Sequence, residues 1–331
     1  MTTNLDKTLD KLERWTVPQL RQLADTVQAM LRDREAEATI EGRAGAARPS
    51  CPHCGTSGAT RWGMSAGLQR WRCQACRKTF NLLTGTPLAH ARHRSELFAA
   101  ARDMAGDRPR SCRKLAQELK VHRTTVWRWR MKLLKPLQGH GQRVLAGLVE
   151  ADETFLRESR KGSREWVDHQ RHGAPPPPRP RWRDHERHGI PIPRGLSRWQ
   201  IPILVLRDRH GGTHAERLPA LRYQHFETVL EARLAADAIL CTDSAAVYRR
   251  YGTQKQRKVE QINVRQGVRV RDGVYHLQNA NAFHARFKDF VRPFCNPATK
   301  NLPLYVGWMV FNDGLRGSTP TGNPLAERLL A

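Results

Sequence analysis

Two pairs of cysteines constrain the N-terminal third of this chain more than any other feature of its sequence. Each pair has the spacing C-x2-C, and eighteen residues separate the two pairs. Two thiolates at this spacing can bind one Zn²⁺, and two such pairs complete a closed tetrahedral site of the structural type. The sequence therefore predicts a structural zinc site with four ligands, Cys51, Cys54, Cys73 and Cys76.

The residues around these cysteines predict a small β-structure of the zinc-ribbon type. Residues 60–62 and 69–72 read as two strands that flank a turn at 65–67. The expected core side chains of this ribbon are Trp62, Trp71 and Phe80. The remaining cysteines are isolated in the sequence, which favours a reducing compartment over a disulfide framework. These are Cys112, Cys241 and Cys295.

The overall charge indicates a polyanionic partner. The 331 residues include 57 Lys and Arg against 31 Asp and Glu, so that the formal net charge is +26. Nucleic acid is the partner that such a charge suits best. No apolar run approaches the roughly 18 residues that a membrane span needs, and the first residues lack the apolar core of a signal peptide. We therefore expect a soluble, cytoplasmic, nucleoid-associated protein with no membrane partner and no small-molecule substrate.

The N-terminal residues predict a helical arm. Apolar residues recur at helical spacing over residues 5–36 and are interrupted by Pro18, which predicts two short helices. Such helices suit an arm that packs against the chain or dimerises. Residues 41–50 are small and polar and include Pro49, so they predict a linker into the first cysteine pair.

Residues 94–137 predict three helices in a helix-turn-helix arrangement. The first helix follows Ser95, the second covers residues 112–119, and a turn at 120–123 leads into the third. Thr124 or Thr125 can cap the third helix. Its apolar residues recur at core spacing and leave a polar face, as a recognition helix requires. The core residues are Val126, Trp129, Leu133 and Leu134.

The polar face of this third helix is strongly basic. Between Arg108 and Lys135 there are ten Lys and Arg and one acidic residue, Glu118. We expect the exposed face to contact DNA phosphates; the alternative is a solvated basic helix with no role in DNA binding. The residues expected to bind DNA are Arg123, Thr125, Arg128, Arg130 and Lys132, together with Arg286 from a later helix.

Two aspartates follow apolar runs that predict buried strands. Residues 144–151 lead to Asp152, and residues 238–242 lead to Asp243, so each carboxylate is expected at a strand terminus. Further strands at 200–207 and 213–218 and a helix at 223–235 lie between them. This order of elements predicts an α/β fold, a ribonuclease-H-like mixed sheet with flanking helices. Two aspartates on neighbouring strands of such a sheet can share Mg²⁺ ions for phosphoryl transfer.

A third metal ligand is expected on a helix that begins near Asn279. Helical geometry places Asn281, His284 and Lys288 on one face of this helix. Asn281 could instead be a helix cap or a surface amide, and His284 could serve packing alone. Three acidic residues fit the third position less well, because of their distance along the chain or their direction on the helix: Glu260, Asp289 and Glu327. Glu153 is expected to face away from Asp152, although it could support the site from behind.

Several blocks of the sequence together resemble the ISXO2-like transposases, which are insertion-sequence transposases of the DDE superfamily that carry an N-terminal zinc ribbon and a helix-turn-helix. The resemblance extends from Cys51 to Asn312. Its blocks are CPHC with RCQACRKTFNLLTGTPL, VEADETFL, CTDSAAVY, and QNANAFHARFKDF with ATKNLPLYVGW.

This resemblance implies that Asp152 and Asp243 are catalytic metal ligands, with Asn281 in the third position and Lys288 seven residues later. Many relatives have Glu in the third position, and some have Asn. An amide oxygen can bind Mg²⁺ but contributes no charge, so it holds the metal more weakly than a carboxylate. The implied cofactors are structural Zn²⁺ and catalytic Mg²⁺, with Mn²⁺ as an alternative. The implied partners are double-stranded DNA, as element ends and as target, and further copies of this chain in a dimer or larger oligomer.

The segment 157–198 departs from the family pattern. It is rich in proline, which predicts no regular structure, and is basic, with Trp166 and Trp182 interleaved and Trp199 directly after it. Such a segment could follow DNA and stack on unpaired bases near the cut; a basic loop without that contact is the alternative. Its two histidine pairs, His169/His172 and His185/His188, are expected to be solvated.

The sequence thus predicts five regions. These are an arm and linker at 1–46, a zinc ribbon at 47–90, a helix-turn-helix domain at 91–140, a catalytic domain at 141–315 with the 157–198 insertion, and a C-terminal tail at 316–331. The predicted function is Mg²⁺-dependent cleavage and strand transfer at insertion-sequence ends. The alternatives are a non-catalytic DNA-binding regulator derived from a transposase and a stand-alone ribonuclease-H-like nuclease.

Overall fold

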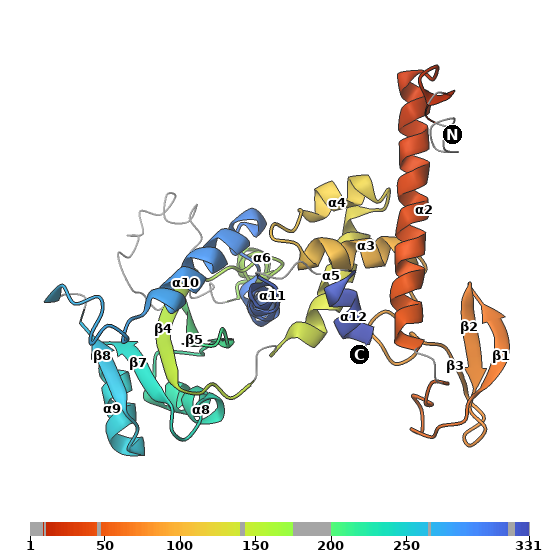
Figure 1. Cartoon of the computed structure of the whole chain (residues 1–331). Helices are drawn as coiled ribbons and strands as arrows, with labels where there is room; N and C mark the ends of the chain where they lie inside the picture. Colours follow the sequence, from red (N-terminus) through yellow and green to blue (C-terminus); the bar gives the residue numbers. More distant parts are fainter. Residues whose placement is uncertain are drawn as a thin grey trace. The chain divides into compact units, whose positions relative to one another are not determined.

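The computed structural model of the chain describes residues 9, 11–44, 48–139, 143–174, 200–263, 266–316 and 322–330. Two compact units contain them, one formed by residues 1–133 and 318–331 and the other by residues 134–317 (Figure 1). None of the helices in the described residues is both long and apolar enough to cross a lipid bilayer.

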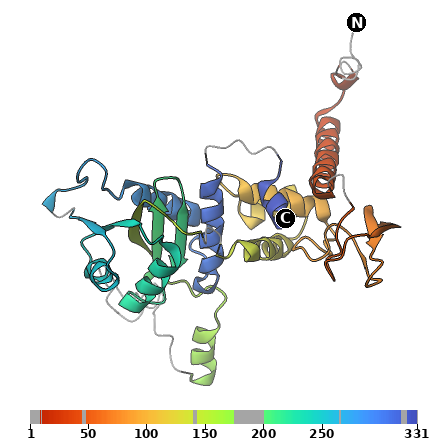
Figure 2. The ribbon, with the colours of Figure 1, turned by 60° about the horizontal axis from the view of Figure 1, so that its bottom comes forward.

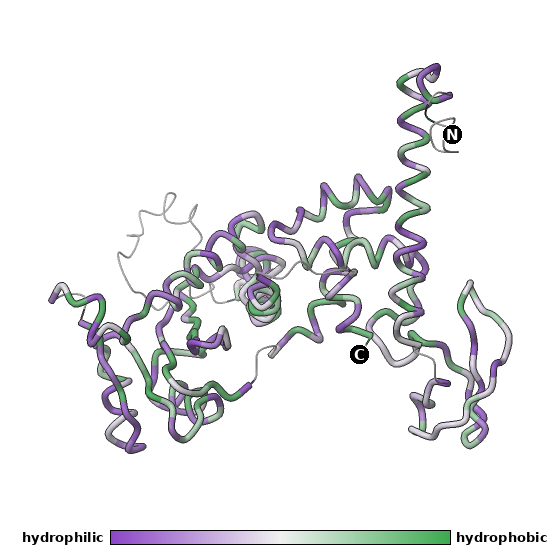
Figure 3. The backbone as a smooth tube through the Cα atoms, in the orientation of Figure 1, coloured by the Kyte–Doolittle hydropathy of each residue, from purple (hydrophilic) through white to green (hydrophobic). Residues whose placement is uncertain are grey.

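The first unit contains, near its N-terminus, a helix that is much longer than the short ones predicted; Leu9, Lys11 and Leu12 before it are also helical, and the non-helical residues 13–16 separate them from it. Helix α2 spans Val17–Ala44 and therefore includes part of the predicted linker. Pro18 lies in its first turn, where backbone N–H groups have no partner within the helix, so the proline starts the helix and does not break it. Hydrophobic and hydrophilic residues alternate along α2 (Figure 3).

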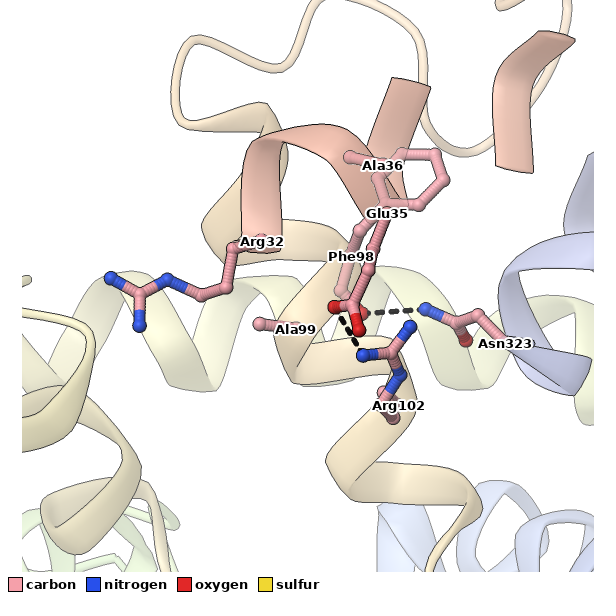
Figure 4. Close-up of a pocket in the computed structure, with 7 residues that line it drawn as sticks. All are labelled: Arg32, Glu35, Ala36, Phe98, Ala99, Arg102 and Asn323. Atoms are coloured by element: carbon pink, nitrogen blue, oxygen red, sulfur yellow. Dashed lines mark hydrogen bonds and ion pairs between the residues drawn. The ribbon is translucent and has the colours of Figure 1, made fainter. Parts of the chain in front are cut away.

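Three helices from both ends of the chain meet in this unit. Helix α2 packs against α3 (Arg94–Ala105) and against the C-terminal α12 (Pro324–Leu330). The contact is polar as well as apolar, because Glu35 and Arg102 form an ion pair and Asn323 donates to the Phe98 carbonyl at 2.7 Å (Figure 4). The residues predicted only as a tail thus contribute a helix to the packing of this unit.

The cysteine-rich segment forms a three-stranded antiparallel sheet in the order β1-β2-β3. The strands are β1 (Thr60–Ser65), β2 (Leu68–Arg72) and β3 (Thr79–Phe80). Trp71 and Phe80 are buried beside Cys51 and Cys73, as predicted. Trp62, the third predicted core residue, is instead 47% exposed. Its neighbour Arg61 pairs with Trp71 across the sheet, so alternation along the strand turns Trp62 to the opposite face.

Three helices with an apolar core follow the ribbon: α3, α4 (Cys112–Glu118) and α5 (Arg123–Leu134). Ser111 caps α4 by accepting from the Lys114 N–H at 3.3 Å. At α5 the cap is His122, whose Nδ1 accepts from the Thr124 N–H at 3.2 Å, and not Thr124 or Thr125 as predicted. The shared core contains Ala100, Leu115, Ala116, Leu119 and Val126.

The second unit is built on a five-stranded mixed sheet in the order β6-β5-β4-β7-β8. Strand β5 is antiparallel to both of its neighbours, β6 and β4, whereas β7 is parallel to β4 and β8 is parallel to β7. The strands are β4 (Leu148–Arg157), β5 (Gln200–Asp208), β6 (Thr213–Arg217), β7 (Ile239–Asp243) and β8 (Val259–Ile262).

Helices cover both faces of this sheet (Figures 1 and 2). On one face, α8 (Tyr223–Arg233) and α9 (Ala246–Lys255) pack with Val149 and Ala151 of β4. On the other, α10 (Gln278–Val291) and α11 (Leu302–Gly314) pack with Ile203 and Val205 of β5. Two short 3₁₀ turns, Arg292–Phe294 and Thr299–Asn301, connect α10 to α11, and a third, Lys135–Leu137, follows α5.

The segment predicted to lack regular structure contains a helix. Helix α6 spans Glu165–His172 and ends at Gly173, which adopts a left-handed conformation. The Nδ1 atom of His169 lies 2.5 Å from the Ala174 carbonyl oxygen. Residues 175–199, which include His185, His188 and two of the three tryptophans, lie outside the described residues.

Gly307 of α11 offers a test of the packing in this unit. A Cβ atom at this position would overlap the Leu137 carbonyl oxygen. We expect Gly307→Ala to lower the free energy of unfolding by about 1–3 kcal/mol because backbone atoms must move apart. Gly314→Ala is the matched control on the same helix, since no atom of the described part of the chain lies within 4 Å of its Cβ position. Urea unfolding of the two variants measures the difference, and equal stabilities would contradict this packing.

Candidate functional site

Asp152 and Asp243 lie side by side at the end of the parallel pairing between β4 and β7. The last paired residues on these strands are Ala151 and Thr242, and each aspartate is the next residue. Neighbouring strands lie roughly 4.8 Å apart, and residues in equivalent positions of parallel strands face the same side. The pairing of the two strands thus brings together carboxylates that are ninety-one residues apart in sequence.

The position of Asp152 within its strand differs from the prediction. Asp243 is the last residue of β7, as predicted, but Asp152 is in the middle of β4. The strand continues to Arg157 because β5 pairs with it along its whole length. Asp152 is nevertheless at an edge of the sheet, because β7 leaves β4 at this level and one side of the strand becomes open.

Helix α10 lies over the aspartate pair. The Nδ1 atom of its buried His284 is 3.8 Å from the Oδ2 atom of Asp152. Asn281 and Lys288 are exposed and lie one turn before and one turn after His284, so the three residues share one side of the helix. Helix α10 therefore carries all three predicted residues, and His284 contacts Asp152.

The surroundings of Asp152 favour its protonated form. Burial raises the pKa of this carboxyl to about 6, and the charge of Asp243 adds to the increase. The Glu153 N–H, which donates to Asp152 at 2.8 Å, and the charge of Lys288 oppose the increase without cancelling it. A half-buried pair of carboxylates with this bias is one that a bound cation would stabilise.

His284 is neutral near pH 7. Burial, with a smaller contribution from the positive charge of Lys288, lowers its pKa to about 4. The imidazole therefore does not neutralise Asp152 as a cation would.

Glu153 faces the opposite side of the sheet from Asp152, as predicted, and contacts a residue that the sequence did not single out. It accepts a hydrogen bond from the hydroxyl of Tyr248, a buried residue of α9. Burial raises the pKa of Glu153 to about 7, with a smaller increase from the charges of Asp152 and Asp243, while the Tyr248 hydrogen bond lowers it. Tyr248 follows Asp243 by five residues, but its spacing alone did not distinguish it from a core aromatic residue.

Glu150 is a second residue that sequence reasoning missed. Its side chain is fully buried in the middle of the unit and contacts the beginning of α10. The alternation Glu150, Asp152 along an apolar strand was the available signal, because it places two acidic residues on one face of the sheet.

The cysteines have the geometry of a metal site. Within the described part of the chain, they form the one group of three or more Cys, His, Asp and Glu side chains close enough to hold a metal ion, with all ligand atoms within 4.8 Å of one another. The Sγ atoms of Cys51 and Cys76 are 3.6 Å apart, as are those of Cys54 and Cys73. A tetrahedron with Zn–S bonds of about 2.3 Å has edges of roughly 3.8 Å. Four sulfurs in this arrangement could bind zinc.

The structure separates the residues predicted to bind DNA into two groups. Arg123, Arg128 and Lys132 are exposed on α5, and Thr125 is half-buried. Lys132 donates to the Ala89 carbonyl at 3.0 Å. Trp127, which the sequence did not select, is 48% exposed beside Arg128, and its position off the apolar stripe of α5 could have identified it.

The other two predicted DNA-binding residues make contacts within the protein. Arg130 is only 2% exposed, and its guanidinium lies 3.7 Å from Asp103 and donates to the Arg110 carbonyl at 2.7 Å. Its prediction as a DNA contact was wrong, because charge alone does not distinguish a buried arginine from an exposed one. Arg286 is partly exposed and is paired with the buried carboxylate of Asp313 at 2.7 Å.

Comparisons with known proteins identify the family of the part of the chain that contains the aspartate pair. The ISXO2-like transposase domain family matches residues 144–312, just over half of the chain. A protein from the transposable element ISH50 of Halobacterium salinarum is 31% identical over 112 residues, which cover 34% of this chain and 38% of that protein.

A solved structure, a pre-cleavage Mos1 transpososome, is also similar to this chain. The match covers 62% of this chain and 75% of that chain with 14% sequence identity. Its TM-score of 0.22 is too low to define a shared fold.

The matched family domain begins just before β4 and ends in α11, so it contains the aspartate pair and the helix above it. This chain therefore belongs to the ISXO2-like transposase domain family.

Proposed function

We propose that this chain is a DDE-type transposase that binds the ends of an insertion sequence, cleaves DNA there and joins the end to a target. The proposal is carried by the position of two carboxylates. Asp152 and Asp243 each directly follow the last residue pair between β4 and β7, beneath α10. The order and directions of the five strands are those expected of a ribonuclease-H-like sheet, which supports the proposal.

Asp152, Asp243 and Asn281 would hold the catalytic metal ions. Two oxygen-donor carboxylates and an amide form a donor set that suits Mg²⁺ or Mn²⁺, and the raised pKa of Asp152 fits a site that a cation completes. Divalent metal bound there supplies charge that activates an attacking oxygen and stabilises the leaving one.

The other residues of the site would orient the DNA and keep the carboxylates in place. Lys288 is exposed on α10 and provides a cation for the DNA backbone next to the scissile phosphate. His284, neutral near pH 7, packs against Asp152 without neutralising it. On the far side of the sheet, Tyr248 holds Glu153 and thereby fixes the backbone that follows Asp152.

The N-terminal unit would hold the DNA end. Helices α4 and α5 have the order and connection of a helix-turn-helix, and α5 presents Arg123, Arg128 and Trp127 to solvent. The ribbon adds positive charge, because residues 48–95 contain no Asp or Glu. Phosphate contacts from these elements would set the position of the duplex.

The arm would serve assembly of the transposase on DNA. Helix α2 exposes five large apolar side chains that suit contact with another copy of the chain: Val17, Leu20, Val27, Met30 and Leu31. Such patches on a protein surface often mark interaction sites.

A DNA-binding regulator is the second candidate, and the amide in the third ligand position favours it. Asn281 brings no charge to the metal site, so loss of catalysis with retained binding is the outcome this candidate predicts. Sequence-specific binding of inverted repeats by purified protein without Mg²⁺-dependent cleavage would support it.

Replacement of either aspartate tests the catalytic proposal. Asp152→Ala and Asp243→Ala should each lower strand joining by at least 10³-fold, because each removes a charged metal ligand. Binding of the DNA end in a gel-shift assay should remain within about twofold of wild type. Asp237→Asn, which changes an exposed acidic residue just before β7, is the control and should join DNA normally. Joining by either alanine variant would remove that aspartate from the active site.

The raised pKa of Asp152 predicts how stability depends on pH and on Mg²⁺. The folded chain binds this proton more tightly than the unfolded chain, so the stability contributed by Asp152 falls as the pH rises from about 4 through about 6. At pH 8 its ionised form costs about 3 kcal/mol.

Mg²⁺ binds the ionised form, so it should raise the melting temperature at pH 8 and have little effect at pH 4.5. Asp152→Asn should be more stable than wild type at pH 8 without metal and should lose most of the response to Mg²⁺. Differential scanning calorimetry measures both effects. An equal response to Mg²⁺ at the two pH values would contradict this assignment.

Salt dependence tests the role of α5. Arg128→Ala should weaken binding of the DNA end and reduce the slope of log K against log salt concentration by about one, because one phosphate contact is lost. Arg328→Ala removes the same charge from an exposed position on α12, a helix that we do not assign to DNA binding, and it should leave the slope unchanged. Equal slopes for both variants and wild type would place the DNA elsewhere on the unit.

A further inference from the structure

We propose that Glu150 is a positioning residue that attaches α10 to β4 and so determines where Asn281, His284 and Lys288 lie relative to the aspartate pair. This inference rests on the proposed function for its catalytic consequence. The attachment itself is a property of the described structure. Glu150 lies two residues before Asp152 on the same face of the central strand.

The burial of Glu150 requires partners for its charge. Its side chain is 0% exposed. A carboxylate in such a place is costly unless several hydrogen-bond donors surround it. A side chain that served packing alone would be apolar, as Val149 and Ala151 on the opposite face are.

Both carboxylate oxygens of Glu150 are used by the first turn of α10. The Oε1 atom accepts from the Asn279 side-chain amide at 2.8 Å, and the Oε2 atom accepts from the Ala280 backbone N–H at 2.8 Å. The residue at the N-cap of this helix, Leu277, offers no side-chain cap. Glu150 therefore supplies, from another element, the acceptor and the negative charge that a helix N-terminus favours.

A third element completes the cluster. Arg209, which follows β5, forms an ion pair with Glu150 and donates to the Val274 carbonyl at 2.8 Å. Its guanidinium also lies 3.0 Å from the ring of His276, and that ring is 3.2 Å from Glu150. The segment that leads into α10 and the first turn of the helix are thus held by the same carboxylate.

The spacing of the two contacts between β4 and α10 explains how the cluster can set the site. From Glu150 to Asp152 the strand advances about 6.6 Å. From Ala280, held by Glu150, to His284, beside Asp152, the helix advances about 6 Å. Strand and helix therefore run together over this distance, and a shift of α10 at Glu150 moves Asn281 by the same amount. Displacements of about 1 Å in such groups are enough to slow chemistry.

Two variants with a matched control test the inference in the full-length protein. Asn279→Ala removes one donor to Glu150 and leaves the buried carboxylate paired with Arg209. Glu150→Gln keeps the shape of the side chain and loses its charge. Thr154→Val is the control, because Thr154 is buried on the same strand and face and its hydroxyl has no hydrogen-bond partner among the residues that the structure describes.

Hydrogen–deuterium exchange of the backbone over residues 278–285 is the first measurement. We expect exchange to rise at least tenfold in both test variants and to be unchanged in the control. Mn²⁺ affinity, followed by electron paramagnetic resonance without DNA, should fall at least threefold. In single-turnover strand transfer the rate should fall tenfold or more while half-saturation by the DNA end stays within twofold, since the DNA-binding unit is untouched.

The outcomes separate this inference from the proposed function. If α10 in both test variants exchanges as in the control, the inference is overturned, whatever the activity. If exchange rises but Mn²⁺ affinity and rate equal those of the control, Glu150 caps a helix without positioning the site, and the inference is again overturned. If exchange rises and Mn²⁺ affinity falls while even the wild-type chain never joins DNA, the proposed function fails and the positioning role stands.

Discussion

The parallel pairing of β4 with β7 is the constraint on which the rest of the site depends. It ends at Ala151 and Thr242, and the next residue on each strand is an aspartate. The other contacts of the site lie around these two aspartates. His284 of α10 contacts Asp152, and Tyr248 binds Glu153 on the opposite face of the sheet. Glu150, two residues before Asp152, accepts a hydrogen bond from the first turn of α10. A slip of one residue in this pairing would separate the carboxylates and turn one of them to the other face.

The site combines a destabilising pair of acids with elements that hold them in place. Burial and mutual repulsion raise the pKa of Asp152 to about 6, so the fold bears a cost at neutral pH that a cation would remove. The sheet tolerates this cost because Asp152 is flanked along β4 by well-paired residues, with β5 bonded to the strand from Val149 to Arg157. Functional sites often contain such costly groups with shifted pKa values, and the well-packed structure around them keeps them in place.

Much of this arrangement could be predicted from local patterns, and the exceptions have physical causes. The cysteine spacing predicted the four-sulfur cluster, and the apolar runs predicted the strands that carry the two aspartates. The exposure of Trp62 and of Arg130 was predicted incorrectly. Pairing with the neighbouring strand decides which face Trp62 lies on, and Asp103 pairs with Arg130 in the interior. Local composition reveals neither contact. Glu150 and Tyr248 were missed because their roles arise from contacts with elements distant in the sequence. The roles of Asn281 and Lys288 stay predictions, supported by their common face on α10.

The most direct measurement of the central claim is the anomalous diffraction of crystals soaked in Mn²⁺. We predict a Mn²⁺ peak bonded to carboxylate oxygens of both Asp152 and Asp243, within about 2.0–2.3 Å of each, on the face of the sheet covered by α10. A peak that touches only one of them, or Mn²⁺ bound elsewhere while the two carboxylates point apart, would contradict the account.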